Sequence, residues 1–146
     1  MPVRRRPAAR EASQANRNRN RNRAEGAVWR RIVQGVLSRD LRVCWICRHP
    51  GANAADHVIP VTERPDLALS AANLRAVHSA SRAGGGECRV CSVAATVKAG
   101  APVRVFCNEI KGSGSIERAR RIIETRTGLA LGSQSSGKPG GERDWE

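Results

Sequence analysis

Two short runs are the most informative part of the sequence: Cys44-Trp45-Ile46-Cys47 and, after eight intervening residues, Asp56-His57-Val58-Ile59-Pro60. Two further pieces follow them, Asn73-Leu74-Arg75 and Cys107-Asn108-Glu109-Ile110-Lys111-Gly112. Two cysteines separated by two residues commonly form half of a metal site. An aspartate beside a histidine joins a metal-binding carboxylate to a side chain that exchanges protons near neutral pH. Together the four pieces indicate a small domain built around metal ions.

The composition allows one small domain with few large apolar side chains. The 146-residue chain has three Trp, one Phe, one Met and no Tyr. Residues 27–131 carry the apolar content of a folded unit, and we take them as the domain. Because so few large side chains limit the apolar surface that can be buried, we expect a metal ion to supplement the core.

The charge of the chain predicts a polyanionic partner. The formal net charge is +13, and residues 1–43 contain twelve Arg against three acidic residues. Arg suits bidentate contacts with phosphate, whereas the near absence of aromatic residues argues against stacking of single-stranded bases. We therefore expect binding to double-stranded DNA. A generally solvated basic surface is the alternative.

The cysteines are expected to bind metal rather than to form disulfides. No segment resembles a signal peptide or a membrane-spanning helix, so we expect a cytoplasmic protein without a membrane partner. Thiols stay reduced in that compartment. An odd number of cysteines, five, with two Cys-x-x-Cys spacings then indicates metal ligands.

The two ends of the chain and two helices are the clearest features of its organisation. Residues 1–26 are expected to form a disordered basic arm, and the Gly- and Ser-rich residues 132–146 a disordered tail. Apolar residues at three-and-four spacing predict a helix over residues 27–38. A second helix is predicted from the N-cap Ser115 to Gly128, with Ile116, Ala119, Ile122 and Ile123 inward and Arg120, Arg121 and Arg126 outward.

The middle of the chain gives weaker signals. Residues 58–61 predict a short strand, and a second strand is expected somewhere within residues 67–69. A short helix or turn is predicted over residues 74–78. Residues 79–104 are expected to be an irregular, glycine-rich insert that holds Cys88 and Cys91. A helix is expected to begin near Cys107.

The four motifs in this order resemble the HNH endonucleases, and the chain is most similar to the small HNH proteins of tailed bacteriophages. The similarity covers about residues 29–128. The resemblance implies an α+β fold with a ββα-metal core, in which a β-hairpin and a helix surround one divalent cation. Flanking helices and a structural zinc knuckle would complete the domain.

The resemblance also implies a role for each polar residue. His57 would be the general base that takes a proton from water. Asp56 and Asn108 would bind the catalytic cation, Mg²⁺ or Mn²⁺. Asn73 would bond to the backbone and so hold His57 in orientation. The residues expected to contact the DNA backbone are Arg75 and Lys111.

The zinc ligands are left open between three arrangements. We favour one Zn²⁺ bound by the two Cys-x-x-Cys pairs, which are Cys44, Cys47, Cys88 and Cys91. The second arrangement, which the family pattern suggests, is Cys44, Cys47, His78 and Cys107, although residues 79–106 separate the last two. In the third, Cys88 and Cys91 are free thiols. In either metal arrangement the zinc is expected to be structural, because a closed site leaves no position for water.

The resemblance makes a metal-dependent DNA endonuclease, a phosphodiester hydrolase, the leading hypothesis. Genome packaging beside terminase subunits is the biological role that phage relatives suggest, with homing or restriction as other roles. A non-enzymatic, zinc-stabilised DNA-binding module is the first alternative, and it predicts no dependence of function on Asp56, His57 or Asn108. An RNA-binding or ribosome-associated zinc protein ranks last, because it gives the Asp-His pair no task.

Overall fold

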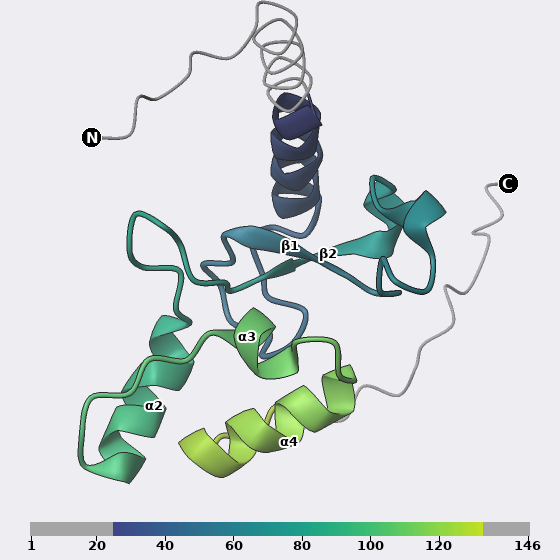
Figure 1. Ribbon diagram of the computed structural model, residues 1–146. Coiled ribbons are helices and arrows are strands. Elements are labelled where there is room, and N and C mark those ends of the chain that lie inside the picture. Colours follow the sequence, from purple (N-terminus) through teal and green to yellow (C-terminus); the bar gives the residue numbers. More distant parts are fainter. Residues whose placement is uncertain (1–24, 133–146) are drawn as a thin grey trace, which may run out of the picture.

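The structure is a computed structural model that describes residues 25–132 (Figure 1). The expected disordered arm and tail therefore lie almost wholly outside the described residues. Residues 25 and 26, which we assigned to the arm, are helical. The helix predicted over residues 27–38 is confirmed, and its described part covers residues 25–39.

The described residues form an α+β fold with four helices and a two-stranded antiparallel sheet, as the fold-class prediction required. After the helix at residues 25–39, the elements are β1 (Ala54–His57), η1 (Pro65–Leu67), η2 (Ala71–Asn73), β2 (Leu74–Val77), α2 (Arg89–Ala99), α3 (Cys107–Lys111) and α4 (Ile116–Thr127). The hairpin lies between the first helix on one side and α2, α3 and α4 on the other (Figure 1).

The strands do not lie where the sequence predicted them. β1 ends at His57, before the predicted strand at residues 58–61, and residues 67–69 contain the end of a 3₁₀ turn instead of a strand. Residues 74–77, which we expected to be helix or turn, form β2, and His57 pairs with Leu74 across the hairpin. Runs of four residues are too short for periodicity to separate strand from helix, so the pairing itself decides.

Arg39 and Asp40 fasten the first helix to the hairpin. The Arg39 guanidinium donates hydrogen bonds to the Ala71 and Leu74 carbonyls and to the Asp40 carboxylate, which in turn accepts one from the Ala76 N–H. Burial alone would raise the pKa of Asp40, but the hydrogen bonds from Arg39 and Ala76 hold that pKa below its usual value.

The insert is more regular than predicted, because it contains α2. The Cys88 thiol caps this helix by accepting a hydrogen bond from the Cys91 N–H, and Gly100 ends it in the left-handed conformation. Val93 and Val97 point to solvent, with exposed fractions of 66% and 78%. Valines on the solvent side remove the apolar periodicity that would have revealed the helix.

The last helix, α4, runs as predicted from the Ser115 cap to Gly128, which has a φ of +73°. The prediction for Arg120 was wrong, because this side chain is buried and not outward. Its guanidinium donates hydrogen bonds to the carbonyl oxygens of Ile46 and Trp45 at 2.9 and 2.8 Å. Within residues 25–132, none of the helices has the length and hydropathy needed to cross a bilayer.

The centre of the core is made of sulfur as much as of hydrocarbon. All five cysteines are at most 1% exposed, and none is in a disulfide. Leu37, Ile46, Val77, Val105 and Ile123 pack around them. The expected shortage of large apolar side chains is therefore met by placing the candidate metal ligands at the middle of the fold.

Candidate functional site

A tight turn carries the first pair of cysteines. Val43 and Pro50 form an isolated antiparallel bridge, the Cys44 N–H donates to the His49 carbonyl, and the Arg48 N–H donates to the Cys44 carbonyl. Arg48 has a φ of +63°, which closes the turn directly after Cys47. We call residues 43–50 the knuckle. The Trp45 N–H bonds to the Ala76 carbonyl of β2, so the hairpin holds the knuckle from one side.

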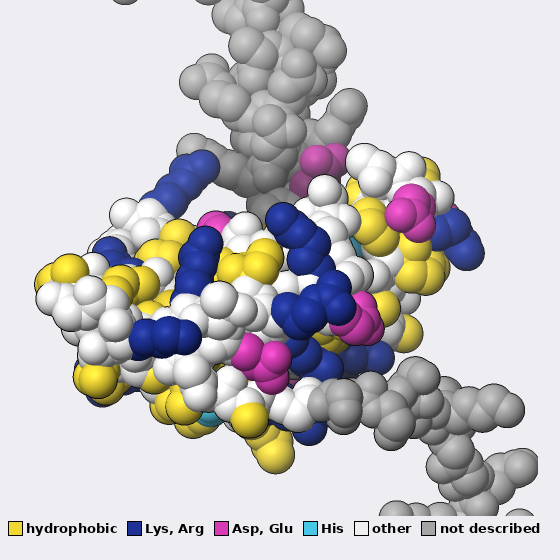
Figure 2. Space-filling model, turned by 90° about the horizontal axis from the view of Figure 1, so that it is seen from below, with side chains coloured by type: hydrophobic (Ala, Val, Ile, Leu, Met, Phe, Trp, Pro, Cys, Tyr) yellow, Lys and Arg dark blue, Asp and Glu magenta, His cyan; other side chains and the backbone are white. Residues whose placement is uncertain are grey.

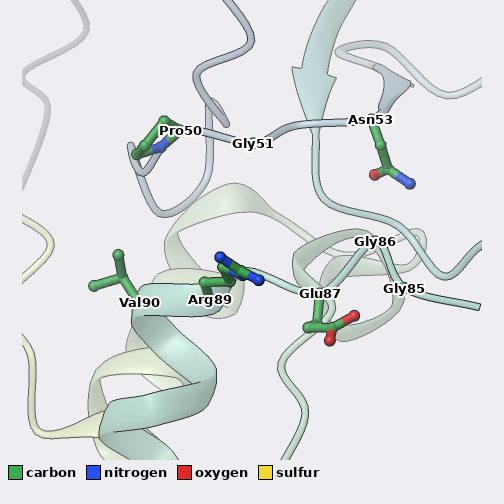
Figure 3. A pocket seen from close by; sticks show the side chains of 8 residues that line it. All are labelled: Pro50, Gly51, Asn53, Gly85, Gly86, Glu87, Arg89 and Val90. Carbon is green, nitrogen blue, oxygen red and sulfur yellow. The ribbon is translucent and has the colours of Figure 1, made fainter.

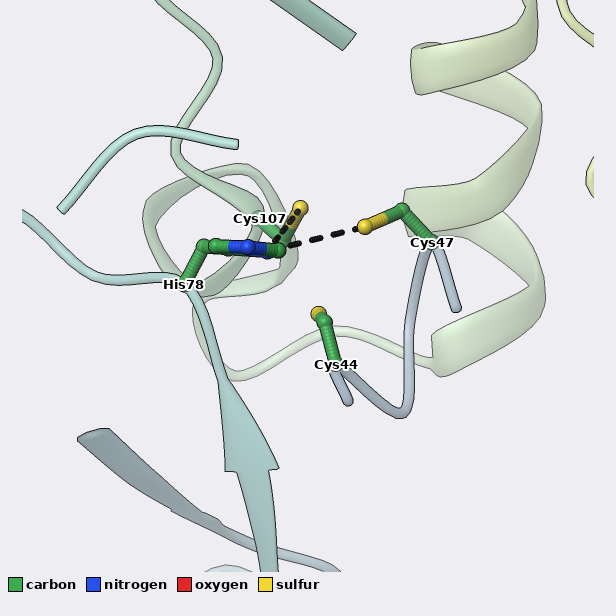
Figure 4. A group of neighbouring side chains, drawn as sticks. All are labelled: Cys44, Cys47, His78 and Cys107. Carbon is green, nitrogen blue, oxygen red and sulfur yellow. Dashed lines mark hydrogen bonds between the residues drawn. The ribbon is translucent and has the colours of Figure 1, made fainter. Parts of the chain in front are cut away.

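The first group of candidate metal ligands contains three thiols and one imidazole. They are Cys44, Cys47, His78 and Cys107, all buried, with ligand atoms within 4.8 Å of one another (Figure 4). His78 Nδ1 lies 3.6 Å from Cys47 Sγ and 3.8 Å from Cys107 Sγ. The other ring nitrogen of His78, Nε2, is 2.9 Å from the Pro50 carbonyl, which can only accept. That bond leaves the lone pair of Nδ1 for a metal ion.

The second group shares Cys47 with the first. It consists of Cys47, His49, Cys88 and Cys91, again with ligand atoms within 4.8 Å of one another. His49 Nδ1 lies 3.5 Å from Cys88 Sγ and 3.3 Å from Cys91 Sγ, and Cys47 Sγ lies 3.7 Å from Cys88 Sγ. The knuckle thus provides ligands to both groups, and the start of α2 provides the remaining two ligands of the second group.

The arrangement that we favoured from the sequence needs correction. The two Cys-x-x-Cys pairs do not form one group of four, because Cys44 is placed with the end of β2 and the start of α3, and not with α2. The second arrangement, with His78 and Cys107, is the one that contains Cys44. Cys88 and Cys91 are buried beside His49 and are not free loop thiols. His49 was missed, although its position two residues after Cys47 was the available signal.

The local hydrogen bonds favour thiolate at two of the five cysteines. Hydrogen bonds from the thiols of Cys107 and Cys47 hold the pKa of Cys44 far below its usual value. Those from Cys47 and Cys91 lower the pKa of Cys88 to about 2. Each group therefore contains one sulfur whose pKa is lowered, and a thiolate is the form that binds metal. Three sulfurs and one nitrogen in a closed, buried site suit a structural metal ion such as zinc.

Asn73 lies on the loop between the strands and clamps the chain just after His57. The residue is 6% exposed. Its side-chain amide donates to the Ile59 carbonyl at 3.0 Å, and its side-chain oxygen accepts from the Ile59 N–H at 2.9 Å. The Asn73 carbonyl also accepts from the Val58 N–H. These bonds fix the direction in which the chain leaves β1.

His57 is held by one hydrogen bond and one ring contact. Its Nε2 lies 2.9 Å from the Ala68 carbonyl oxygen, and its ring stacks on Trp29 with 5.8 Å between centroids and 16° between planes. A carbonyl oxygen only accepts, so Nε2 carries the proton and the neutral ring keeps its lone pair on Nδ1. The half-buried His57 is therefore set up to accept a proton at Nδ1.

Asp56 and Lys111 form a buried ion pair between β1 and α3. The Asp56 Oδ2 and Lys111 Nζ atoms are 3.0 Å apart, and the side chains are 11% and 5% exposed. No hydrogen bond is assigned to Asp56 Oδ2, so this contact is an ion pair. Lys111 Nζ also lies 5.7 Å from the centre of the Trp45 ring. Lys111 is thus not the surface contact to DNA that we expected.

Asn108 and Arg75 have their own partners. Asn108 Nδ2 donates to the Ser79 hydroxyl at 3.3 Å, and Asn108 lines a hollow of about 400 Å³ beside Trp29 and Arg30. Arg75 lies opposite Asp56 in the hairpin, with its guanidinium bonded to the Ala72 and Leu74 carbonyls. Among residues 25–132, Asp56 belongs to no cluster of three His, Cys, Asp or Glu side chains that would hold a metal ion.

One hollow lies beside the second ligand group, and His57 does not line it. It measures about 700 Å³ and is lined by Pro50, Gly51, Asn53, Gly85, Gly86, Glu87, Arg89 and Val90 (Figure 3). Gly86 is packed so closely that a Cβ there would overlap the Ser79 carbonyl oxygen. Glu87 is paired with Arg104 at 2.9 Å. The hollow therefore brings no unpaired carboxylate to the site.

One face of the domain is basic. Arg118, Arg121 and Arg126 on α4 are exposed, and Arg104 lies over the Phe106 ring at 5.1 Å. Seen from below, this surface carries Lys and Arg side chains over much of its area, with some Asp and Glu side chains beside them (Figure 2). Such a surface attracts a polyanion.

No family model, curated protein or solved structure matches the chain. The function is therefore inferred from the residues of this chain.

Proposed function

We propose that this protein is a metal-dependent DNA endonuclease of the HNH type, which hydrolyses phosphodiester bonds with His57 as general base. The observation that carries the proposal is the pair of hydrogen bonds between the Asn73 side-chain amide and the Ile59 backbone, one donated and one accepted by Asn73. These bonds to the backbone two residues after His57 support an orienting role for Asn73. Three features restrict the imidazole of His57: the Asn73–Ile59 hydrogen bonds nearby in the chain, the bond from Nε2 to the Ala68 carbonyl, and the ring contact with Trp29.

The tautomer of His57 identifies Nδ1 as the atom that would act as general base. His57 Nδ1 keeps its lone pair, because Nε2–H is committed to the Ala68 carbonyl. A water molecule held at Nδ1 would lose a proton as its oxygen attacks the phosphorus atom, and the Nε2–H bond would steady the imidazolium that forms. A positioned base of this kind contributes about 10²- to 10⁴-fold to a rate.

The residues proposed to hold the catalytic cation are Asp56 and Asn108. Asp56 Oδ2 is buried, and no hydrogen bond is assigned to it, so the ammonium group of Lys111 is the partner that a metal ion would have to replace. A bound Mg²⁺ or Mn²⁺ would stabilise the charge that develops on the phosphate and on the leaving oxygen. Lys111 already neutralises Asp56 at 3.0 Å. A divalent cation must therefore compete with this ammonium group, and the negative charge of bound DNA would favour that exchange.

Double-stranded DNA is the proposed substrate. The net charge of +13 and the arginines of α4 supply a sequence-independent attraction to phosphate. Among the described residues we identify no helix that reads bases, so cutting at many sequences is expected. As the biological role we propose genome packaging beside a phage terminase. If the protein neither binds a purified terminase subunit nor changes cutting by the complex, that role is wrong.

A DNA-binding module without turnover is the second candidate. The buried pair of Asp56 and Lys111 favours this candidate, because the Asp56 carboxylate can serve only to neutralise Lys111, without binding a metal ion. Such a protein would bind DNA with the same dependence on salt, but its function would not change on substitution of His57.

Plasmid relaxation at low salt tests the proposal. Wild type, His57→Ala and Asp56→Asn are compared with magnesium, with manganese and with EDTA, after matched zinc content and circular dichroism are confirmed. Asp66→Asn is the control, because this carboxylate is exposed and pairs only with Arg64. We expect the wild type and Asp66→Asn to nick the plasmid, and His57→Ala and Asp56→Asn to leave it intact. EDTA is expected to abolish the nicking. Equal nicking by the His57→Ala variant, or none by any protein with DNA binding retained, would reject the nuclease.

A further inference from the structure

Seven side chains meet at the knuckle, and one belongs to both groups of candidate metal ligands. The first group is Cys44, Cys47, His78 and Cys107, and the second is Cys47, His49, Cys88 and Cys91. Each group has three sulfurs and one nitrogen. Two tetrahedra that share one corner need seven ligands, which is the number present.

We propose that this chain binds two zinc ions at once and that the thiolate of Cys47 bridges them. Each ion would be bound by three sulfurs and one imidazole nitrogen, with the Cys47 sulfur as a common corner. The single structural zinc that the sequence led us to expect would be half of this cluster. The proposal does not depend on nuclease activity.

The distances in both groups have the size of tetrahedral edges. With Zn–S bonds of about 2.3 Å and Zn–N bonds of about 2.0–2.1 Å, two sulfurs lie about 3.8 Å apart, and a sulfur and a nitrogen about 3.6 Å apart. Cys47 Sγ is 3.7 Å from Cys88 Sγ on one side and 3.6 Å from His78 Nδ1 on the other. Cys47 is therefore at edge distance from a member of each group.

The distances to the imidazoles agree. His49 Nδ1 is 3.5 Å from Cys88 Sγ and 3.3 Å from Cys91 Sγ. His78 Nδ1 is 3.8 Å from Cys107 Sγ. Both imidazoles thus present Nδ1 to the sulfurs, and the Pro50 carbonyl already fixes the His78 tautomer that this requires.

Charge and burial favour two ions over one. Five thiolates with two Zn²⁺ leave one negative charge, and the buried Arg120 guanidinium, bonded to the Trp45 and Ile46 carbonyls of the knuckle, can offset it. With one ion in the first group, Cys88, Cys91 and His49 would have no metal to bind. Two buried sulfur atoms and a half-buried imidazole at ligand distances, without a disulfide, are then left unexplained.

The second ion would fasten the insert to the rest of the domain. Cys88 caps α2, and Cys91 lies in its first turn, where the positive end of the helix stabilises thiolates. The knuckle and the hairpin make their backbone hydrogen bonds independently of α2. The two sites therefore have separable structural tasks, although they share a sulfur.

The number of zinc ions and their coupling test the proposal. The full chain is purified under reducing conditions with zinc, and the metal content is measured by native mass spectrometry and by elemental analysis. Two zinc ions per chain are expected for wild type and one for His49→Ala. The control is His57→Ala, which removes an imidazole outside both groups and is expected to keep two ions. One ion in the wild type at saturating zinc, or two in the His49→Ala variant, would overturn the proposal.

Cadmium substitution tests the shared sulfur without any variant. The wild-type chain loaded with ¹¹³Cd is expected to give two resonances that are coupled to each other, because a common sulfur transmits the coupling between the two nuclei. Two resonances without mutual coupling would refute the bridge, and a single resonance would refute the second site. This measurement remains decisive if the His49→Ala protein does not fold.

Discussion

Replacing Arg120 by methionine removes the guanidinium that joins α4 to the knuckle while keeping a long aliphatic side chain. The wild-type group donates to the Ile46 and Trp45 carbonyls, and the residue is 7% exposed. Both carbonyls lose their charged partner in the variant. Burial also lowers the pKa of Arg120, so the wild type itself bears a desolvation cost that methionine avoids.

The expected loss of stability is a few kcal/mol. A hydrogen bond to a charged group contributes about 1.5–3 kcal/mol, so the two bonds together give roughly 3–6 kcal/mol. Relief of the desolvation cost reduces this to about 2–4 kcal/mol. For a domain of this size, each kcal/mol shifts the melting temperature by about 4–8 °C. A decrease of about 10–25 °C is therefore expected.

Urea unfolding and thermal melts of zinc-saturated protein measure this loss. The control is Arg121→Met, the next residue along α4, whose side chain is exposed. Its effect is expected to stay within about 0.5 kcal/mol, as for other surface changes. If Arg120→Met and Arg121→Met have the same small effect, the bonds to the knuckle do not stabilise the fold and the reasoning fails.

Three further predictions concern the glycine at the insert, the buried ion pair and the metal. Gly86→Ala is expected to reduce the free energy of unfolding by about 1–3 kcal/mol more than Gly84→Ala. Both glycines have a positive φ, but only a Cβ on Gly86 would overlap the Ser79 carbonyl, so equal melting temperatures of the two variants would contradict this. Lys111→Met and Asp56→Asn are each expected to reduce the free energy of unfolding by about 3–5 kcal/mol, because each leaves one buried group without its partner. The double variant is expected to lose less than the sum of the two, and additive losses in urea unfolding would refute the coupling. Removal of zinc by a strong chelator is expected to abolish cooperative unfolding, because the five cysteines occupy the centre of the core; an unchanged circular-dichroism melt would show that metal is not structural.

Helix termini and helix periodicity carried the correct part of the fold prediction. The helix from Ser115 to Gly128 was visible because a cap, an apolar stripe and a terminal glycine agree there. α2 was hidden because Val93 and Val97 are exposed. The hairpin was misplaced by several residues, since its strands are four residues long and depend on each other for their definition.

The candidate site was visible in the sequence as a set of residues but not as a set of contacts. Cysteine spacing indicated metal binding, yet spacing does not tell which pairs meet, and only the fold brings Cys44 to His78 and Cys107. His49 had no second histidine nearby to mark it. The burial of Lys111 and Arg120 also escaped prediction, because a basic side chain in a basic chain is expected at the surface.

The ligand groups have a consequence for the order in which the chain acquires structure during synthesis. The second group is complete once Cys91 has left the ribosome, whereas the first waits for Cys107, far downstream of the knuckle. A nascent chain that ends between Cys91 and Cys107 has all the ligands of the second group but lacks one ligand of the first. Long-range contacts of this kind form late and slow folding. With both groups binding zinc as proposed, the supply of metal to the nascent chain would be a step on the folding pathway.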